Sequence, residues 1–237
     1  MKDINISILV PAYNEGKRIP KFLGELIKFC SQNLENFEVL IIDDGSNDNT
    51  KEVVLDLIKN HRKMKLLRYP ENKGKGRAVL MGVLKARGEF VLFIDADGSI
   101  KPEEILNMYN FYQKYNYDII VGSRISLTSN ITNPQPLSRR LMSKFFNLYS
   151  NILFRIKIND LLCGFKGFSK NTAIQVFKNL KAFRWEFDVE ILYRARKNSL
   201  KVYQMPIEWK HEEGSKIKPF DPILILLNLI VLRLRYL

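Results

Sequence analysis

Two carboxylates, Asp95 and Asp97, stand at the end of an apolar run within residues 90–99. Side chains two positions apart on an extended chain point to the same side, and carboxylate oxygens are preferred ligands of Mg²⁺ and Mn²⁺. Such a cation in turn binds phosphates. The spacing therefore predicts a site for a divalent metal and a phosphorylated ligand, although an ordinary solvated Asp-Gly turn would have the same composition.

The elements that position this pair alternate between strand and helix. Apolar runs predict strands at 6–10, 37–42 and 90–94 with a weaker one at 63–69, and periodic stretches predict helices at 18–32, 50–60 and 76–86. This order predicts an α/β fold with a Rossmann-like, mostly parallel sheet and helices on both faces, in which ligands bind beyond the carboxyl ends of the strands. Polar clusters at 11–15 and 43–46 follow two of the strands, so we expect them on the same rim as Asp95.

Length and composition are those of one globular domain. The chain has 237 residues, of which 46% are hydrophobic, and no Pro/Gly/Ser-rich linker divides it. Cys30 and Cys163 lack metal-ligand spacing, so reduced thiols are expected rather than a disulfide or a zinc site. The first residues lack the charged and apolar regions of a secretory signal, which favours a location at the cytoplasmic face of a membrane.

The formal net charge of +13 calls for an anionic partner such as nucleic acid, an anionic membrane or a phosphorylated ligand. No acidic residue occurs from 119 to 159, and residues 137–158 have helical periodicity with an apolar face flanked by basic side chains. That pattern is typical of a helix in a membrane interface, and also of a core helix with a solvated basic face. A nucleic-acid-binding module is an alternative of another class, but the sequence has no helix-turn-helix, zinc or RNP motif.

A second apolar segment ends the sequence. Residues 223–232 are strongly apolar and are followed by Arg233 and Arg235. A membrane span needs about 20 apolar residues, and this run has about half that number. We therefore expect residues 219–237 to form an amphipathic helix that anchors the protein peripherally, unless the helix packs on the domain or on another subunit.

Several motifs together carry a family resemblance. One set resembles the family-2 glycosyltransferases of the GT-A fold and lies at 10–15, 43–46, 72–76, 95–97 and 122–124. A second set resembles the dolichyl-phosphate β-glucosyltransferase branch of polyprenyl-phosphate glycosyltransferases and lies at 163–166, 184–190, 213–216 and 233–236. The resemblance implies one glycosyltransferase domain at 1–218. Its nucleotide-sugar half would be 1–124, and its acceptor half 125–218 would include the interfacial helix at about 137–158.

The resemblance also implies roles for individual residues. Asp95 and Asp97 would hold Mg²⁺ or Mn²⁺, Arg124 and Lys216 would bind phosphate oxygens, and Asp188 lies where hydroxyl-using relatives carry a catalytic Asp. Ser99 stands where mannosyl relatives often place a metal-binding Gln, so the third metal ligand is unassigned. The nucleotide-sugar would contact Pro11, Ala12, Tyr13, Glu15, Asp43, Asp44, Lys75, Asp95, Ala96 and Asp97, and the acceptor would contact Arg139, Arg140, Trp185 and Ser215.

The expected reaction is an inverting, metal-dependent transfer of a hexose, foremost glucose from UDP-glucose, to dolichyl or another polyprenyl phosphate. A phosphate monoester is already anionic near pH 7, so the attack needs no general base. Alternatives within the family are mannose transfer from GDP-mannose and transfer to a glycan hydroxyl. A membrane scaffold without activity is a further alternative. The expected partners are the UDP-hexose, the lipid phosphate and an anionic membrane, with a membrane partner or a second copy as a further option.

Overall fold

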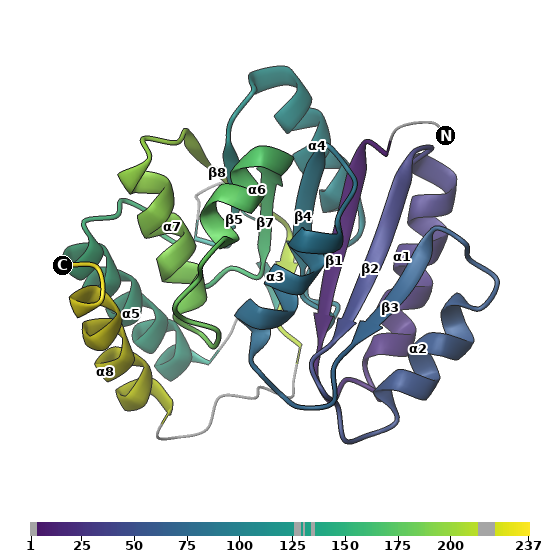
Figure 1. The fold of residues 1–237 in the computed structure, drawn as a ribbon, viewed down its shortest axis with the longest axis horizontal. Coiled ribbons are helices and arrows are strands. Elements are labelled where there is room, and N and C mark those ends of the chain that lie inside the picture. Colours follow the sequence, from purple (N-terminus) through teal and green to yellow (C-terminus); the bar gives the residue numbers. More distant parts are fainter. Residues whose placement is uncertain (1–3, 126–128, 130, 134–135, 213–220) are drawn as a thin grey trace.

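The computed structural model describes residues 4–125, 129, 131–133, 136–212 and 221–237 (Figure 1). Helices and strands alternate along the first half of the chain, as the sequence predicts. The helices are α1 (Ile19–Asn33), α2 (Thr50–Ile58), α3 (Lys75–Lys85), α4 (Glu103–Tyr115), α5 (Leu137–Phe154), α6 (Lys170–Phe177), α7 (Phe187–Lys197) and α8 (Asp221–Leu234).

A seven-stranded sheet, in the order β3-β2-β1-β4-β7-β5-β8, forms the centre of the described structure. Its strand pairs are parallel except those of β7, which runs antiparallel to both β4 and β5. A short second sheet pairs β6 (Ile131–Asn133) with β9 (Trp209–Lys210). The strands of the large sheet are β1 (Ile6–Ala12), β2 (Phe37–Asp43), β3 (Met64–Arg68), β4 (Phe90–Ile94), β5 (Ile119–Ser123), β7 (Phe165–Ser169) and β8 (Val202–Pro206).

Helices cover both faces of the sheet, and each face has its own hydrophobic cluster. Along β1, Ile8 and Val10 belong to the cluster that includes α1, α2 and α4, whereas Leu9 belongs to the cluster that includes α3, α6 and α7. Because side chains alternate along a strand, a strand buried on both faces is mostly apolar, as β4 is at all five positions. The predicted mostly parallel α/β sheet with helices on both faces is confirmed.

The helices α5 and α8 lie side by side at one end of the molecule (Figure 1). Arg233 on α8 donates from Nε to the carbonyl of Leu153 on α5 at 3.2 Å. α5 ends at Phe154, four residues before the predicted end, because Arg155 adopts a left-handed conformation with φ 52°. No helix in the described part of the chain is both long enough and apolar enough to cross a membrane.

Both helices expose apolar side chains, which we call the α5–α8 surface. They bury one apolar face, as Ile225, Leu229 and Leu232 show on α8, while other large apolar side chains remain open to solvent. The exposed residues are Leu137, Leu141, Met142, Phe145, Leu148 and Ile152 on α5, and Leu224, Leu227, Ile230, Val231 and Leu234 on α8.

Candidate active site

The reversed strand β7 brings the residues before it to the carboxyl end of β4. Phe165 at the start of β7 pairs with Ile94 at the end of β4. The next residue, Asp95, donates its backbone N–H to the carbonyl of Gly164 at 3.1 Å. A Cβ added to Gly164 would lie 1.9 Å from Oδ2 of Asp95, so the Asp95 carboxylate occupies its place only because residue 164 is a glycine.

Lys75 faces Asp95 from the first residue of α3. Its Nζ lies 2.6 Å from Oδ1 of Asp95, and both side chains are partly exposed. Burial lowers the pKa of Lys75, but the negative charges of Asp95, Asp188 and Asp97 outweigh it and raise the pKa above its ordinary value. The ammonium therefore stays charged beside three carboxylates.

Asp97 completes the pair of carboxylates. Its Oδ1 accepts the backbone N–H of Ser99 at 2.9 Å. Burial and the negative charge of Asp95 raise the pKa of Asp97, and the hydrogen bond from Ser99 only partly opposes them. Two carboxylates that disfavour each other's charge form a site that a cation stabilises.

The donor set fits a hard divalent cation carried in with a phosphorylated ligand. Asp95 and Asp97 offer carboxylate oxygens, and Asp95 remains partly open to solvent. Within the described ranges, no cluster of three or more His, Cys, Asp or Glu side chains is placed to hold a metal ion. A site with two carboxylates leaves further coordination positions for phosphate oxygens and water, as Mg²⁺ sites commonly do.

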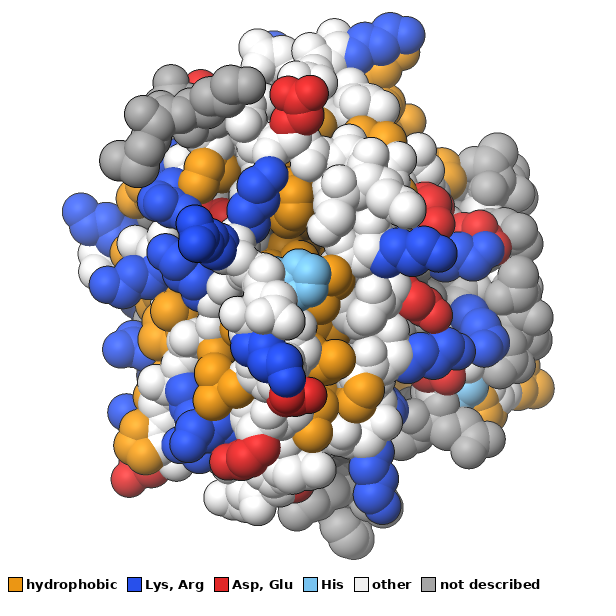
Figure 2. All heavy atoms as spheres, turned by 90° about the vertical axis from the view of Figure 1, so that its right-hand side faces the viewer, with side chains coloured by type: hydrophobic (Ala, Val, Ile, Leu, Met, Phe, Trp, Pro, Cys, Tyr) orange, Lys and Arg blue, Asp and Glu red, His pale blue; other side chains and the backbone are white. Residues whose placement is uncertain are grey.

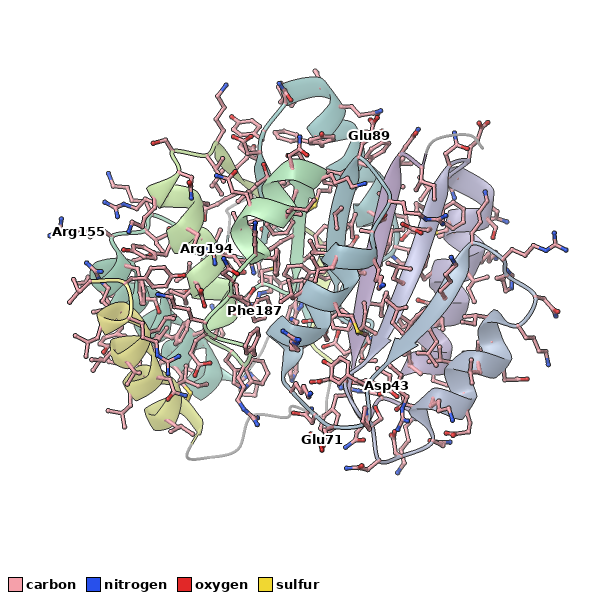
Figure 3. All side chains as sticks on the ribbon, viewed as in Figure 1. Asp43, Glu71, Glu89, Arg155, Phe187 and Arg194 are labelled. Atoms are coloured by element: carbon pink, nitrogen blue, oxygen red, sulfur yellow. The ribbon has the colours of Figure 1, made fainter. Side chains whose placement is uncertain are left out.

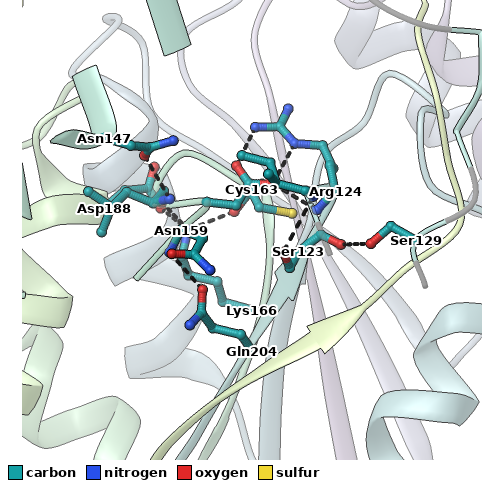
Figure 4. A network of polar contacts seen from close by, with 12 residues as sticks. Ser123, Arg124, Ser129, Asn147, Asn159, Cys163, Lys166, Asp188 and Gln204 are labelled. Carbon is teal, nitrogen blue, oxygen red and sulfur yellow. Dashed lines mark hydrogen bonds and ion pairs between the residues drawn. The ribbon is translucent and has the colours of Figure 1, made fainter. Parts of the chain in front are cut away.

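Asp188, in the first turn of α7, is bound within the protein. Lys166 Nζ donates to its Oδ1 at 2.5 Å and to the carbonyls of Cys163 at 2.6 Å and Leu161 at 2.9 Å (Figure 4). Burial raises the pKa of Asp188, although the charges of Lys166 and Lys75 counteract it. A row of alternating charge thus runs from the rim into the core, through Asp95, Lys75, Asp188 and Lys166.

Arg124 forms a second ion pair close by, with Asp160. Its Nε donates to Oδ2 at 2.8 Å, its Nη2 to Oδ1 at 2.6 Å, and its backbone N–H to Oδ2 at 2.8 Å. Burial raises the pKa of Asp160, but the guanidinium outweighs it and the pKa is lowered. The Arg124 side chain is 20% exposed, and its guanidinium has more N–H donors than the two that bind Asp160. A phosphate can be bound only through these remaining donors.

The loop at 158–164 is hydrogen-bonded to several elements around it. Asn159 donates its backbone N–H to Oε1 of Gln204 on β8 at 2.7 Å, and Leu161 donates to Oδ1 of Asn147 on α5 at 3.1 Å. Together with Asp160 on Arg124, these bonds join α5, β5 and β8 (Figure 4). Sequence reasoning included Lys166 in the motif at 163–166 but gave it no role. It missed Asp160, whose only signal is that it is the first acid after the acid-free stretch.

The predicted nucleotide crevice lies at the carboxyl ends of β1 and β2, where Figure 3 labels Asp43. Asp43 is fully buried and accepts the N–H of Ser46 at 2.9 Å and Nε of Arg68 at 2.8 Å. Asp44 is also buried and accepts the backbone N–H groups of Lys73 at 2.8 Å and Gly74 at 2.9 Å. The Asp44 carboxylate therefore shapes the loop that presents Lys75.

The other residues predicted to bind the nucleotide-sugar or the acceptor differ in location and burial. Pro11, Ala12 and Glu15 are buried, and Tyr13 is partly exposed. Ala96 is buried between the two carboxylates, Trp185 is partly exposed just before α7, and Arg140 is exposed on α5. Ser215, Lys216 and the side chain of Arg139 lie outside the described residues.

The face that carries α1 and α2 bears on the nucleic-acid alternative. In Figure 2, many Lys and Arg side chains lie in the left part of this face, and Asp and Glu side chains are interspersed with Lys and Arg over the view. A nucleic-acid-binding surface usually gathers its cations along one strip. The interspersed carboxylates make this face a mixed-charge surface, which does not favour that alternative.

Comparison with known proteins gives consistent matches. The family described as Glycosyl transferase family 2 matches residues 7–177. A protein of Dictyostelium discoideum named dolichyl-phosphate beta-glucosyltransferase is 34% identical, over 99% of this chain and 76% of its own length. The human protein of the same name is 33% identical, over 98% of this chain and 76% of its own length.

Solved structures share the fold. Glucosyl-3-phosphoglycerate synthase from Mycobacterium tuberculosis, in complex with UDP, superposes with a TM-score of 0.72 at 15% identity, over 98% of this chain and 79% of that one. S. aureus TarS in complex with UDP-GlcNAc gives 0.62 at 21% identity, over 96% and 66%. At these identities the likeness concerns the fold alone.

Proposed function

Since the chain belongs to glycosyl transferase family 2, and is thus a glycosyltransferase, we propose that it transfers glucose from UDP-glucose to dolichyl phosphate or a related polyprenyl phosphate. Relatives with that activity in their names match nearly the whole chain. The observation that carries the choice of acceptor is the state of Asp188. Its carboxylate is buried and bound by Lys166, so it does not stand free to take a proton from a hydroxyl acceptor.

The donor binds at the carboxyl rim in this proposal. Asp95 and Asp97 hold Mg²⁺ or Mn²⁺, which supplies positive charge to the diphosphate as it leaves the sugar. Lys75 leaves or shares Asp95 when the donor binds, and its ammonium then lies within reach of the same phosphates. The uridine occupies the crevice bounded by residues 11–15 and by Asp43 and Asp44.

The acceptor needs orientation more than activation. A phosphate monoester is anionic at neutral pH and attacks the anomeric carbon without loss of a proton to the enzyme. Attack from the face opposite the leaving diphosphate inverts the configuration and gives a β-linked lipid phosphosugar. Arg124 is held by Asp160 and lies close enough to Asp95 to feel its negative charge, and its remaining N–H donors are left for a phosphate.

A lipid acceptor requires contact with a membrane, and we assign that contact to the α5–α8 surface, at the cytoplasmic face. Its apolar side chains are accompanied by exposed basic ones, which suit anionic headgroups: Arg140, Lys144, Arg155 and Arg235. Leu148→Glu and Leu227→Glu should each weaken binding to phosphatidylserine vesicles about tenfold or more, because a buried leucine contributes about 1.5–3 kcal/mol. Leu84→Glu, an equally exposed leucine on α3, is the control.

The decisive experiment offers the protein a short-chain polyprenyl phosphate with radiolabelled UDP-glucose or GDP-mannose, Mg²⁺ or Mn²⁺, and an EDTA control. Label from UDP-glucose should enter the lipid phase only in the presence of metal. Label from GDP-mannose alone would refute the donor. Metal-dependent release of UDP without labelled lipid would refute the lipid acceptor and direct the test to glycan hydroxyls.

A further inference from the structure

A cavity of about 290 Å³ lies between the segment before α7 and the helix α8. Its polar lining comes from three parts of the chain that are distant in sequence. Lys73 lies on the loop before α3, Lys181, Arg184 and Glu186 lie on the segment before α7, and Asn228 lies on α8 beside the apolar Leu232.

The charge of this cavity is positive. Three cations line it against one carboxylate, which gives 3 − 1 = +2. Glu186 is buried and accepts Nδ2 of Asn228 at 2.7 Å, and Lys181 donates to the carbonyl of Arg235. Among the described residues, the side chains of Lys73 and Arg184 have no ion pair, although both are exposed at the rim. Two cations are thus available to an anion.

One wall of the cavity is shared with the active site. Gly76 donates its backbone N–H to the carbonyl of Phe183 at 2.8 Å, and a Cβ on Gly74 would lie 2.3 Å from that same oxygen. This close contact packs the loop before α3 against the segment before α7. In the sequence, Lys73 is two residues from Lys75 and Arg184 is four residues from Asp188, so the two segments that line the cavity also lead into the charged row.

The opposite wall of the cavity is formed by Asn228 and Leu232 of α8. Leu224 is spaced four residues before Asn228, so it lies on the same face of the helix. It is 56% exposed, which places an open apolar side chain beyond the cavity toward the start of α8. A ligand with an anionic head and an apolar tail matches this combination.

We propose that this cavity is the docking site through which the prenyl phosphate acceptor approaches the active site. Lys73 and Arg184 bind its phosphate, and its first isoprene units leave the cavity along α8 past Leu224. The inference rests on the proposed function, and it gives a role to two residues, Lys73 and Arg184, that lie in the motifs at 72–76 and 184–190 but had none assigned.

The test compares the KM values for the two substrates in transfer assays with geranyl phosphate and UDP-glucose. Lys73→Ala and Arg184→Ala should each raise the KM for geranyl phosphate about fivefold, and the double variant more than tenfold, because each removes one charge-assisted contact to phosphate. The KM for UDP-glucose and kcat should change less than twofold. Lys114→Ala with Arg196→Ala, exposed cations on α4 and α7, is the matched control.

A binding measurement by calorimetry separates this inference from the proposed function. If the wild-type protein binds geranyl phosphate through Lys73 and Arg184 but transfers no sugar to it, the proposed site is supported and the proposed function is refuted. Unchanged binding and KM in the double variant would overturn the site while transfer continues. Equal affinity for inorganic phosphate, or for phosphatidic acid vesicles, would overturn the assignment to a prenyl phosphate, and Leu224→Ser should weaken only the prenyl compound.

Discussion

Replacement of Lys166 by methionine tests the buried ion pair beneath the active site. The side chain of Lys166 is fully buried, and its ammonium binds Asp188 and the carbonyls of Leu161 and Cys163. Loss of one partner of a buried pair costs about 3–5 kcal/mol, because the other charge stays buried without compensation. For a chain of this length that corresponds to a fall in Tm of about 6–20 °C.

The effect should depend on pH with a defined sign. Burial already raises the pKa of Asp188 in the folded protein, and loss of Lys166 raises this pKa further. A folded-state pKa above the unfolded value means that the folded protein holds the proton more tightly, so this contribution is present at low pH and is lost as the pH rises through the folded pKa. The variant should therefore lose less stability at pH 5 than at pH 8.

Thermal and urea unfolding of four proteins measures the coupling free energy between Lys166 and Asp188. The wild type, Lys166→Met, Asp188→Asn and the double variant form a cycle, in which we expect a coupling of about 1–3 kcal/mol. Lys178→Met, at an exposed lysine after α6, should stay within about 0.5 kcal/mol of the wild type. Additive single effects, or a loss of stability that is equal at both pH values, would refute the reasoning.

Three further predictions concern the rim. Gly164→Ala displaces the Asp95 carboxylate and should weaken activation by Mn²⁺ about 10–100-fold in a metal titration; an unchanged titration would contradict the 1.9 Å contact. Since the pKa of Asp97 is raised, its charge opposes folding above that pKa, so Asp97→Asn should raise Tm in EDTA at pH 8 and not at pH 4; a lower Tm at pH 8 would argue against this. Arg124→Lys keeps the charge but loses the paired hydrogen bonds to Asp160, which should cost about 1–3 kcal/mol in urea unfolding; an unaltered midpoint would count against that pairing.

The parallel part of the sheet was predictable from the sequence because it is buried on both faces. β1, β2 and β4 read as continuous apolar runs, and the predicted helix at 18–32 is α1 at Ile19–Asn33. The paired carboxylates at Asp95 and Asp97 were predictable for the same reason, since they follow directly on such a strand. Their metal-binding role stays a prediction.

The reversed strand was not predictable from local pattern. β7 contains Lys166 and Gly167 among its five residues, so it lacks an apolar run, and its direction is set by pairing with strands far away in the chain. The partners of Arg124 and Asp188 were missed with it, because Asp160 lies just before β7 and Lys166 lies in it. Likewise the sequence placed Asp44 at the rim, but only the structure shows that its carboxylate accepts the backbone N–H groups of Lys73 and Gly74.

The reversal of β7 also has a consequence for how the chain folds. β4 is paired with β1 on one side only until β7 arrives from about 70 residues further along the chain. Until then its other edge presents unpaired backbone groups on an apolar strand, which is a template for association with other chains. The nascent chain is therefore most prone to aggregate between the synthesis of these two strands, and a fragment that stops at residue 124 would keep that edge open permanently.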